Sequence, residues 1–333
     1  MTTARNVPVT TDMAGDELDA EDAWHSGRRH GLGRLLREAF LRFRLGDGFT
    51  HARALALQIA LSVVPFMIAI TGLAADLDAD KTAKVIAETA SSLTPGSRQS
   101  DVLSSALSPS GTAERAGELA LWFGLAFALF SMTMAMAQVE RGANRIYGIS
   151  RDRPGVPRYV RAAVLTAVLA LPVGLGFVLL VAGGPFGDAM TSVSGWSATT
   201  ETAWDVLRWP VGLVVTTLSI AVLLDHAPRR RQPQLSWLAL GAAVAVALTM
   251  AASGMLALYV HFSDSLGTVY GPLAGIIALL LWCQLTSFAL YFGIAMAAQL
   301  EAVRAGVPDP DAGDPGPATE AGVPAAGGVR SPS

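Results

Sequence analysis

Six residues of the chain could line a polar path through otherwise apolar surroundings. Five have neutral side chains that form hydrogen bonds, and a proline removes one backbone hydrogen bond and so frees a carbonyl group; the six are Gln58, Ser62, Pro65, Gln138, Gln284 and Ser287. Amide and hydroxyl groups can solvate water or the polar part of a larger molecule. The same side chains could instead bond between neighbouring helices, a contact that contributes about 0.6 kcal/mol on average in membranes.

Other kinds of chemistry find few residues to carry them. The sequence contains no His-Glu-x-x-His zinc motif, no Gly-x-Ser-x-Gly nucleophile motif, no Gly-x-x-x-x-Gly-Lys phosphate loop and no Cys-x-x-Cys pair. Its five histidines are scattered without the spacing of metal ligands. A net charge of −3 argues against a nucleic-acid partner. We therefore predict no catalytic residue, no metal and no cofactor.

The apolar residues that surround the six polar candidates gather in long segments. Of the 333 residues, 52% are hydrophobic and only 15% are charged, and the mean hydropathy is +0.43. A helix needs about 20 apolar residues to cross a bilayer core of about 30 Å, and six segments qualify, at 54–75, 119–139, 162–183, 207–224, 237–259 and 273–300. The sequence thus predicts an all-α polytopic membrane bundle with six transmembrane helices. The spans are nearly free of ionisable side chains, which argues against a charged relay for ions or protons.

Arginines mark every second connection between these spans. They cluster before the first span, between the second and third, and between the fourth and fifth, at 28–53, 141–161 and 229–231. Because cytoplasmic loops collect Lys and Arg, the pattern predicts that both termini lie in the cytoplasm.

The two ends of the chain differ from the membrane domain that we expect over residues 31–304. Residues 1–30 are polar, and most of their charged side chains are acidic. Residues 305–333 are rich in Pro, Gly and Ala. Both segments are therefore predicted to be disordered tails. Residues 32–45 form an amphipathic pattern, with leucines and phenylalanines on one helical face and arginines on the other. This segment predicts a helix that lies in the membrane surface or that packs on the bundle.

Four stretches of the chain carry a family signature. They are HARALALQIALSVVPFMIAITGL at 51–73, QVERGANRIYGI at 138–149, VLRWPVGLVV at 206–215 and the stretch from Gly267 to Glu301. Together they resemble the YihY/BrkB family of bacterial inner-membrane proteins, nearest to its YhjD-like branch. The residues that match are Asn144, Arg145, Tyr147, Gly148, Tyr270, Gly271, Trp282 and Gly293.

The resemblance covers residues 32–304 and implies a six-span bundle in the bacterial inner membrane. The family has been labelled ribonuclease BN and, elsewhere, a serum-resistance virulence factor, but this chain offers no metal-binding constellation to support a nuclease. It departs from the family pattern at Gln58 and Ile59, where aromatic residues are frequent, and at Ile294 and Ala295, where an acidic residue is common. The second departure weakens any mechanism that needs a carboxylate inside the membrane.

Three functional hypotheses follow. The first is a non-enzymatic transporter that moves a lipid or another amphipathic molecule, because kinked spans with neutral polar side chains suit such a cargo. The second is a structural protein whose basic cytoplasmic loops and residues 144–148 dock a partner or anionic lipid. The third, a ribonuclease, rests on the family label alone. Membrane lipids are the expected partners, and Gly271 with Gly275 could serve a homo-oligomer or packing within one chain.

Overall fold

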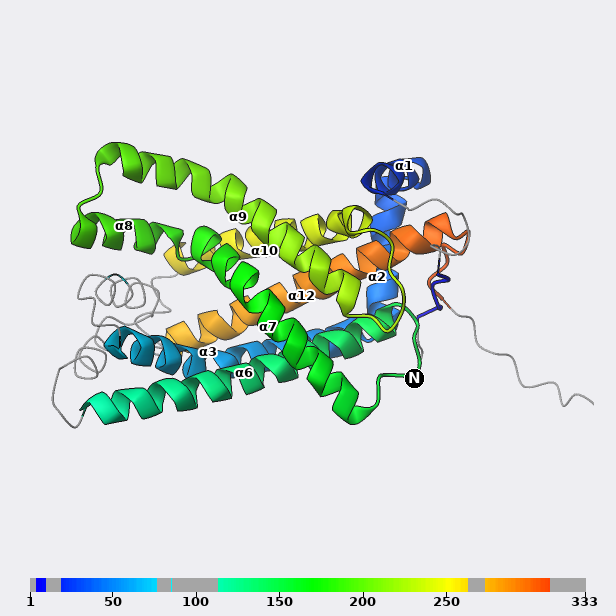
Figure 1. Cartoon of the computed structure of the whole chain (residues 1–333). Helices are drawn as coiled ribbons and strands as arrows, with labels where there is room; N and C mark the ends of the chain where they lie inside the picture. The colour runs from blue at the N-terminus through cyan, green and yellow to red at the C-terminus, as the bar shows by residue number, and fades with distance from the viewer. Residues whose placement is uncertain (1–3, 10–18, 77–84, 86–112, 263–272, 312–333) are drawn as a thin grey trace, which may run out of the picture.

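The computed structural model describes residues 4–9, 19–76, 85, 113–262 and 273–311, and every regular element among them is a helix. Six helices are long: α3 (Gly48–Asp76), α6 (Ala113–Ile146), α7 (Gly155–Leu180), α9 (Ala198–His226), α10 (Leu235–Phe262) and α12 (Leu273–Arg304). Three are short: α1 (Ala20–His30), α2 (Leu32–Leu45) and α8 (Gly183–Ser194). The long helices run along the molecule, and α1 and α2 lie across one end of it (Figure 1). The all-α prediction is confirmed for the described residues.

Five of the described helices are long and apolar enough to cross a membrane. These segments are Trp122–Ile146, Gly155–Leu180, Ala198–His226, Leu235–Tyr259 and Gly275–Arg304. They contain or overlap the predicted second to sixth spans. The predicted first span, 54–75, lies within the 29 residues of α3. Pro65, Pro172 and Pro210 each lie inside a helix that continues beyond them.

Small residues bring α10 and α12 into close contact. A Cβ atom on Gly241 would lie 2.8 Å from Ala297 Cβ, and one on Gly293 would lie 2.7 Å from Ala245 Cβ. Each glycine also lies against the backbone carbonyl of the other. The two helices thus meet through a Gly-x-x-x-Ala pair on each side, a pattern that allows close backbone approach in membranes. This gives Gly293, a residue of the predicted family motif, a structural role.

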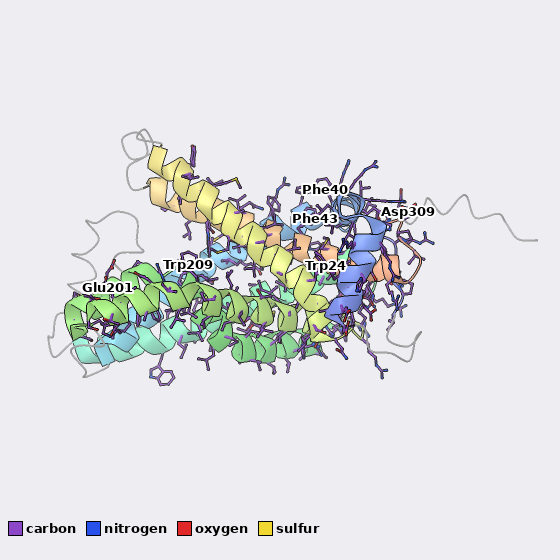
Figure 2. All side chains as sticks on the ribbon, turned by 90° about the horizontal axis from the view of Figure 1, so that it is seen from above. Trp24, Phe40, Phe43, Glu201, Trp209 and Asp309 are labelled. Carbon is purple, nitrogen blue, oxygen red and sulfur yellow. The ribbon has the colours of Figure 1, made fainter. Side chains whose placement is uncertain are left out.

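The core of the bundle lies at the end that α1 and α2 cross. A cluster of buried residues there joins α2, α3, α6, α10 and α12, and its largest member is Trp237, which is fully buried. Figure 2 shows Trp24, Phe40 and Asp309 at this end and Glu201 at the opposite end. The loops between α6 and α7 and between α9 and α10 also lie at the crossed end (Figure 1). We call it the core end.

The structure differs from the predicted tails at both ends of the chain. Ala20–His30 forms α1, whose first turn is capped by the Asp19 carboxylate, and residues 4–9 and 305–311 pack on the core end. The Arg5 N–H donates to the Pro310 carbonyl at 2.9 Å. Helix α1 was missed because it packs through Ala23 and Gly27 instead of an apolar stripe; a Cβ on Gly27 would lie 3.3 Å from Leu300 Cδ2.

Candidate functional site

The structure places the six predicted path residues on three helices that pack against one another. Helix α3 contributes Gln58, Ser62 and Pro65, helix α6 contributes Gln138, and helix α12 contributes Gln284 and Ser287. Aromatic contacts fix the level of α3 against α12. The rings of Phe49 and Phe288 lie 5.6 Å apart, and those of His51 and Tyr291 lie 6.2 Å apart.

Two of the path residues are bonded within the protein. The Gln138 amide nitrogen lies 2.9 Å from His51 Nδ1, and the Tyr291 hydroxyl donates to the Gln138 backbone carbonyl at 2.9 Å. Ser62 donates to the carbonyl of Ile59 in its own helix at 2.7 Å. These contacts are of the structural kind, because they join α3 to α6 and α6 to α12 or satisfy a local hydroxyl.

Three other path atoms are buried without a hydrogen-bond partner among the described residues. They are the amide oxygen of Gln58, the amide nitrogen of Gln284 and the hydroxyl of Ser287. A buried polar group left unpaired costs about 1–3 kcal/mol by protein mutational data. Native proteins rarely carry such a cost without a water molecule or a ligand to relieve it. The three groups on α3 and α12 could accept a water molecule or a polar guest, as could other buried atoms without a partner among the described residues, such as Arg42 Nη2 and the Thr216 hydroxyl.

A second polar cluster lies at the core end and contains the predicted motif residues. Asn144 is fully buried. Its amide nitrogen donates to Asp152 Oδ1 at 2.9 Å, and its amide oxygen accepts the backbone N–H of Arg229 at 2.8 Å. One side chain thus ties the loop after α6 to the loop after α9. Neighbouring Arg145 is partly exposed.

Tyr147 and Gly148 hold the first described residues of the chain against the bundle. The Tyr147 ring is buried with the Arg230 guanidinium 4.9 Å from its centroid, and burial raises the pKa of its hydroxyl. Its carbonyl accepts the Val7 N–H at 3.1 Å. Gly148 has a φ of +75°, and a Cβ there would lie 2.6 Å from the Ala4 carbonyl oxygen. Glycine is therefore required both for the left-handed turn and for this contact.

Buried charges complete the cluster, and the sequence analysis missed them. Arg42 is fully buried; its Nε donates to Gln299 Oε1 at 2.8 Å and its Nη1 donates to the Arg5 carbonyl at 2.9 Å. Burial lowers the pKa of the Arg42 guanidinium to about 10. Arg230 forms an ion pair with Glu301 and donates to the Val7 carbonyl at 2.8 Å. In sequence, Arg42 is one of several arginines on an amphipathic helix, and nothing distinguishes it from the exposed ones.

The remaining motif residues fall into two groups. The Trp282 indole donates to Ser253 Oγ at 3.0 Å and so adds a polar contact between α12 and α10. Gly293 lies at the close contact of the same two helices. Tyr270 and Gly271 lie outside the described residues.

One charged residue inside a predicted span was overlooked. Arg208 lies within 207–224, and its side chain is only 16% exposed. Its Nε lies 3.3 Å from Asp205 Oδ1, and its guanidinium lies 5.4 Å from the Trp209 ring centroid. A Cβ on Gly183, at the start of α8, would lie 2.9 Å from the Arg208 side chain. The signal was available, because a charge within an apolar segment is itself unusual.

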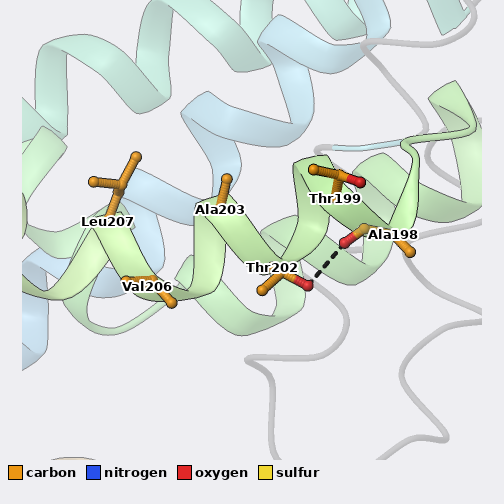
Figure 3. Close-up of a pocket in the computed structure, with 6 residues that line it drawn as sticks. All are labelled: Ala198, Thr199, Thr202, Ala203, Val206 and Leu207. Atoms are coloured by element: carbon orange, nitrogen blue, oxygen red, sulfur yellow. Dashed lines mark hydrogen bonds between the residues drawn. The ribbon is translucent and has the colours of Figure 1, made fainter.

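An open hollow of about 620 Å³ lies beside the first half of α9 (Figure 3). Its described lining consists of Ala198, Thr199, Thr202, Ala203, Val206 and Leu207. The Thr202 hydroxyl donates to the Ala198 carbonyl at 2.8 Å, so the lining offers little free polar chemistry. The hollow is separate from the predicted path, whose residues lie on α3, α6 and α12.

Comparisons with known proteins identify relatives along most of the chain. It is 27% identical over 260 residues to the putative ribonuclease-like protein YfkH of Bacillus subtilis, covering 78% of this chain and 92% of the relative. It is 30% identical over 281 residues to a UPF0761 membrane protein of Chromohalobacter salexigens, covering 80% and 63%. A UPF0761 membrane protein of Azotobacter vinelandii is 25% identical over 183 residues, covering 55% and 43%. The chain therefore spans less than two thirds of the length of the two UPF0761 relatives. No solved structure matches it.

The family comparison agrees with the resemblance drawn from the motifs. The model described as Virulence factor BrkB matches residues 39–317, which include every predicted span. With five helices able to cross a membrane, this match makes the chain an integral membrane protein, and the protein belongs to the BrkB (YihY/BrkB) family.

Proposed function

We propose that this protein is a non-enzymatic transporter that moves a lipid or another amphipathic molecule across or within the bacterial inner membrane. The observation that carries the proposal is that polar atoms of Gln58, Gln284 and Ser287, all buried on the packed helices α3 and α12, have no hydrogen-bond partner among the described residues. Water or a polar head group that entered between these helices would supply the missing hydrogen bonds.

The chemistry of these groups favours an amphipathic cargo over a bare ion. Amide and hydroxyl groups can bond to a head group at modest cost, whereas a cation that leaves water needs several carboxylate or carbonyl ligands. The charged residues of the described spans lie mostly near helix ends, and Arg208 is paired with Asp205. A carboxylate relay for protons therefore has little support.

The proposal includes six spans with both termini in the cytoplasm. The described ends of the chain lie at the same end of the bundle, where Arg5 bonds to Pro310, and this supports an even number of crossings. Helix α3 supplies the sixth span. The arginines at 141–161 and 229–231 belong to the loops of this core end, which favours a cytoplasmic location for it.

Topology is tested with single cysteines in a Cys283→Ala background. The variants Arg304→Cys and Thr199→Cys each place a cysteine at one end of the bundle. Cells that carry either variant are treated with a membrane-impermeant maleimide, and labelling shows which end faces the outside. We expect labelling at position 199 in intact cells and at position 304 only after lysis. Labelling at position 304 in intact cells would contradict a cytoplasmic core end.

Transport is tested in proteoliposomes with a phospholipid labelled on its head group and a membrane-impermeant quencher. Wild-type protein should raise the quenched fraction above that of vesicles without protein and of vesicles with an unrelated six-span protein. The double variant Gln58→Leu with Gln284→Leu should lose this excess, because it removes two of the three unpaired polar groups. Thr202→Val is the matched control, since its hydroxyl bonds within α9 and its loss should leave translocation unchanged. Equal translocation by the folded double variant and the wild type would refute the path.

The docking hypothesis has weaker support. Asn144 and Tyr147 are buried, so a partner could not contact their side chains in this conformation. Arg153 and Arg230 are paired with Glu140 and Glu301. The ribonuclease name belongs to the Bacillus subtilis relative, and we propose no such activity for this chain.

A further inference from the structure

Helix α2 leaves one apolar ridge uncovered while it packs on the bundle with the adjacent face. Leu35, Ala39 and Phe43 are buried against the core. Leu32, Leu36 and Phe40, spaced four residues apart, are 53%, 45% and 46% exposed. We call these three residues the α2 ridge. A soluble protein would bear a cost for such a row on its surface, so the α2 ridge points to an apolar environment beyond the protein.

The α2 ridge is continuous with the surface of a long helix. The Phe40 ring lies 6.3 Å from the ring of Phe49 on α3, and Phe49 is itself 38% exposed. Phe49 in turn contacts Phe288 on α12. Figure 2 shows Phe40 and Phe43 on α2 at the core end, where α2 crosses the long helices. The ridge therefore extends the apolar surface of the bundle sideways at the level where the long helices end.

Two exposed arginines border the α2 ridge. With 3.6 residues per turn, Arg44 lies about 40° and Arg37 about 60° around the helix from Phe40. Neither forms an ion pair among the described residues. By contrast, Arg42 is buried and Arg34 is paired with Glu38. An apolar strip edged by free guanidinium groups is the arrangement of a helix that lies at an anionic lipid surface.

We propose that α2 lies in the plane of the bilayer at the core end, with the α2 ridge in the boundary between head groups and acyl chains and with Arg37 and Arg44 on anionic head groups. Its occupant is the lipid surface and not a second copy of the chain. Three half-exposed side chains fall far short of the about 1,200–2,000 Å² that a stable protein interface buries. The proposal depends on membrane insertion alone, so failure of lipid transport would leave it standing.

The test uses environment-sensitive fluorophores on single cysteines in a Cys283→Ala background. Leu36→Cys and Phe40→Cys place the label on the α2 ridge, and two positions keep the test valid if one variant misfolds. Arg34→Cys is the matched control, because this side chain is 68% exposed on another side of the same helix. Full-length labelled protein is reconstituted into vesicles of phosphatidylcholine alone, or of phosphatidylcholine and phosphatidylglycerol in equal amounts.

We expect labels at positions 36 and 40 to show blue-shifted emission, quenching by nitroxides on the lipid chains and loss of quenching by aqueous iodide. The label at position 34 should show the reverse. The difference should be larger in the phosphatidylglycerol vesicles, and Arg37→Gln with Arg44→Gln should remove that increase while Arg34→Gln does not.

Iodide quenching at positions 36 and 40 equal to that at position 34 would overturn the proposal. Protection of the ridge labels from both quenchers would overturn it too, because it would mean that protein covers the ridge. Equal depth in the two lipid mixtures, unchanged by the Arg37 and Arg44 substitutions, would refute the role of the anionic head groups.

Discussion

Exchange of the partners in the Asn144–Asp152 hydrogen bond gives a quantitative test of the core-end cluster. In the wild type the Asn144 amide donates to Asp152 and accepts from the Arg229 N–H. Asn144→Asp keeps the acceptor for Arg229 but sets two carboxylates against each other at hydrogen-bond distance. Asn144→Asp with Asp152→Asn restores a donor opposite a carboxylate, with the two roles exchanged.

The interactions that Asn144 makes set bounds on how far each substitution lowers the free energy of unfolding. Loss of a buried hydrogen bond that leaves an unsatisfied partner costs about 1–3 kcal/mol. If one carboxyl takes up a proton to avoid repulsion, the cost is at most about 1.4 kcal/mol per pH unit between about 3.9 and 7, or about 4 kcal/mol. We therefore expect Asn144→Asp to cost about 2–4 kcal/mol, which corresponds to a fall in Tm of roughly 5–10 °C. Asp152→Asn alone keeps an acceptor and should cost about 1 kcal/mol.

The assay is thermal unfolding of purified protein in one detergent, followed by intrinsic tryptophan fluorescence for the wild type, both single variants and the double variant. The double variant should unfold at a higher temperature than Asn144→Asp. If it unfolds at the same temperature or lower, the two side chains do not act as a pair, and the proposed link between the two loops is refuted.

Two further substitutions test the packing and the burial of the core end. Gly293→Ala should lower Tm by several degrees, because its Cβ would lie 2.7 Å from Ala245 Cβ. Gly174→Ala is the control and should leave Tm unchanged, because its Cβ would meet no atom within 4 Å. Equal effects of the two substitutions would refute the close contact of α10 and α12. The raised pKa of Tyr147 means that the folded state keeps this proton above pH 10 while the unfolded state loses it. Because the unfolded state releases this proton and the folded state keeps it, the free energy of unfolding is constant below about pH 10 as far as this group is concerned. It falls as pH rises above about 10, by up to about 1.4 kcal/mol per pH unit. Relative to Tyr147→Phe, the wild type should therefore lose stability between pH 9 and 11 in denaturant titrations, and parallel curves for the two proteins would contradict the burial.

Sequence patterns predicted the elements of this protein far better than their contacts. Residues 32–45 were predicted as a helix and form α2 with the same bounds, because a regular apolar periodicity fixes a helix wherever it packs. Helix α1 escaped prediction, since packing through Ala23 and Gly27 leaves no apolar stripe to detect. Helix α8 follows α7 closely and lies in the segment predicted to be a loop between the third and fourth spans.

The candidate site shows the same division. Gln58, Gln138 and Gln284 could be selected as polar residues in apolar spans, and the structure places them on three mutually packed helices. Gln138 bonds to His51, whereas Gln58 and Gln284 each have an atom with no partner in the described part of the chain. This difference depends on side-chain positions that tertiary packing sets. The burial of Arg42 has the same origin, because its partner Gln299 is 257 residues away in the chain.

That separation has a consequence for biosynthesis. Chains are made at about 5–20 residues per second, so Gln299 follows Arg42 out of the ribosome after tens of seconds. Until then α2 carries an arginine without its side-chain partner, and the Arg5 N–H lacks the Pro310 carbonyl that it later meets. The core end is therefore the last part of the bundle to close. A chain that stops before Gln299 would retain most of its apolar spans but would lack the residues that Arg42 and Arg5 contact at the core end.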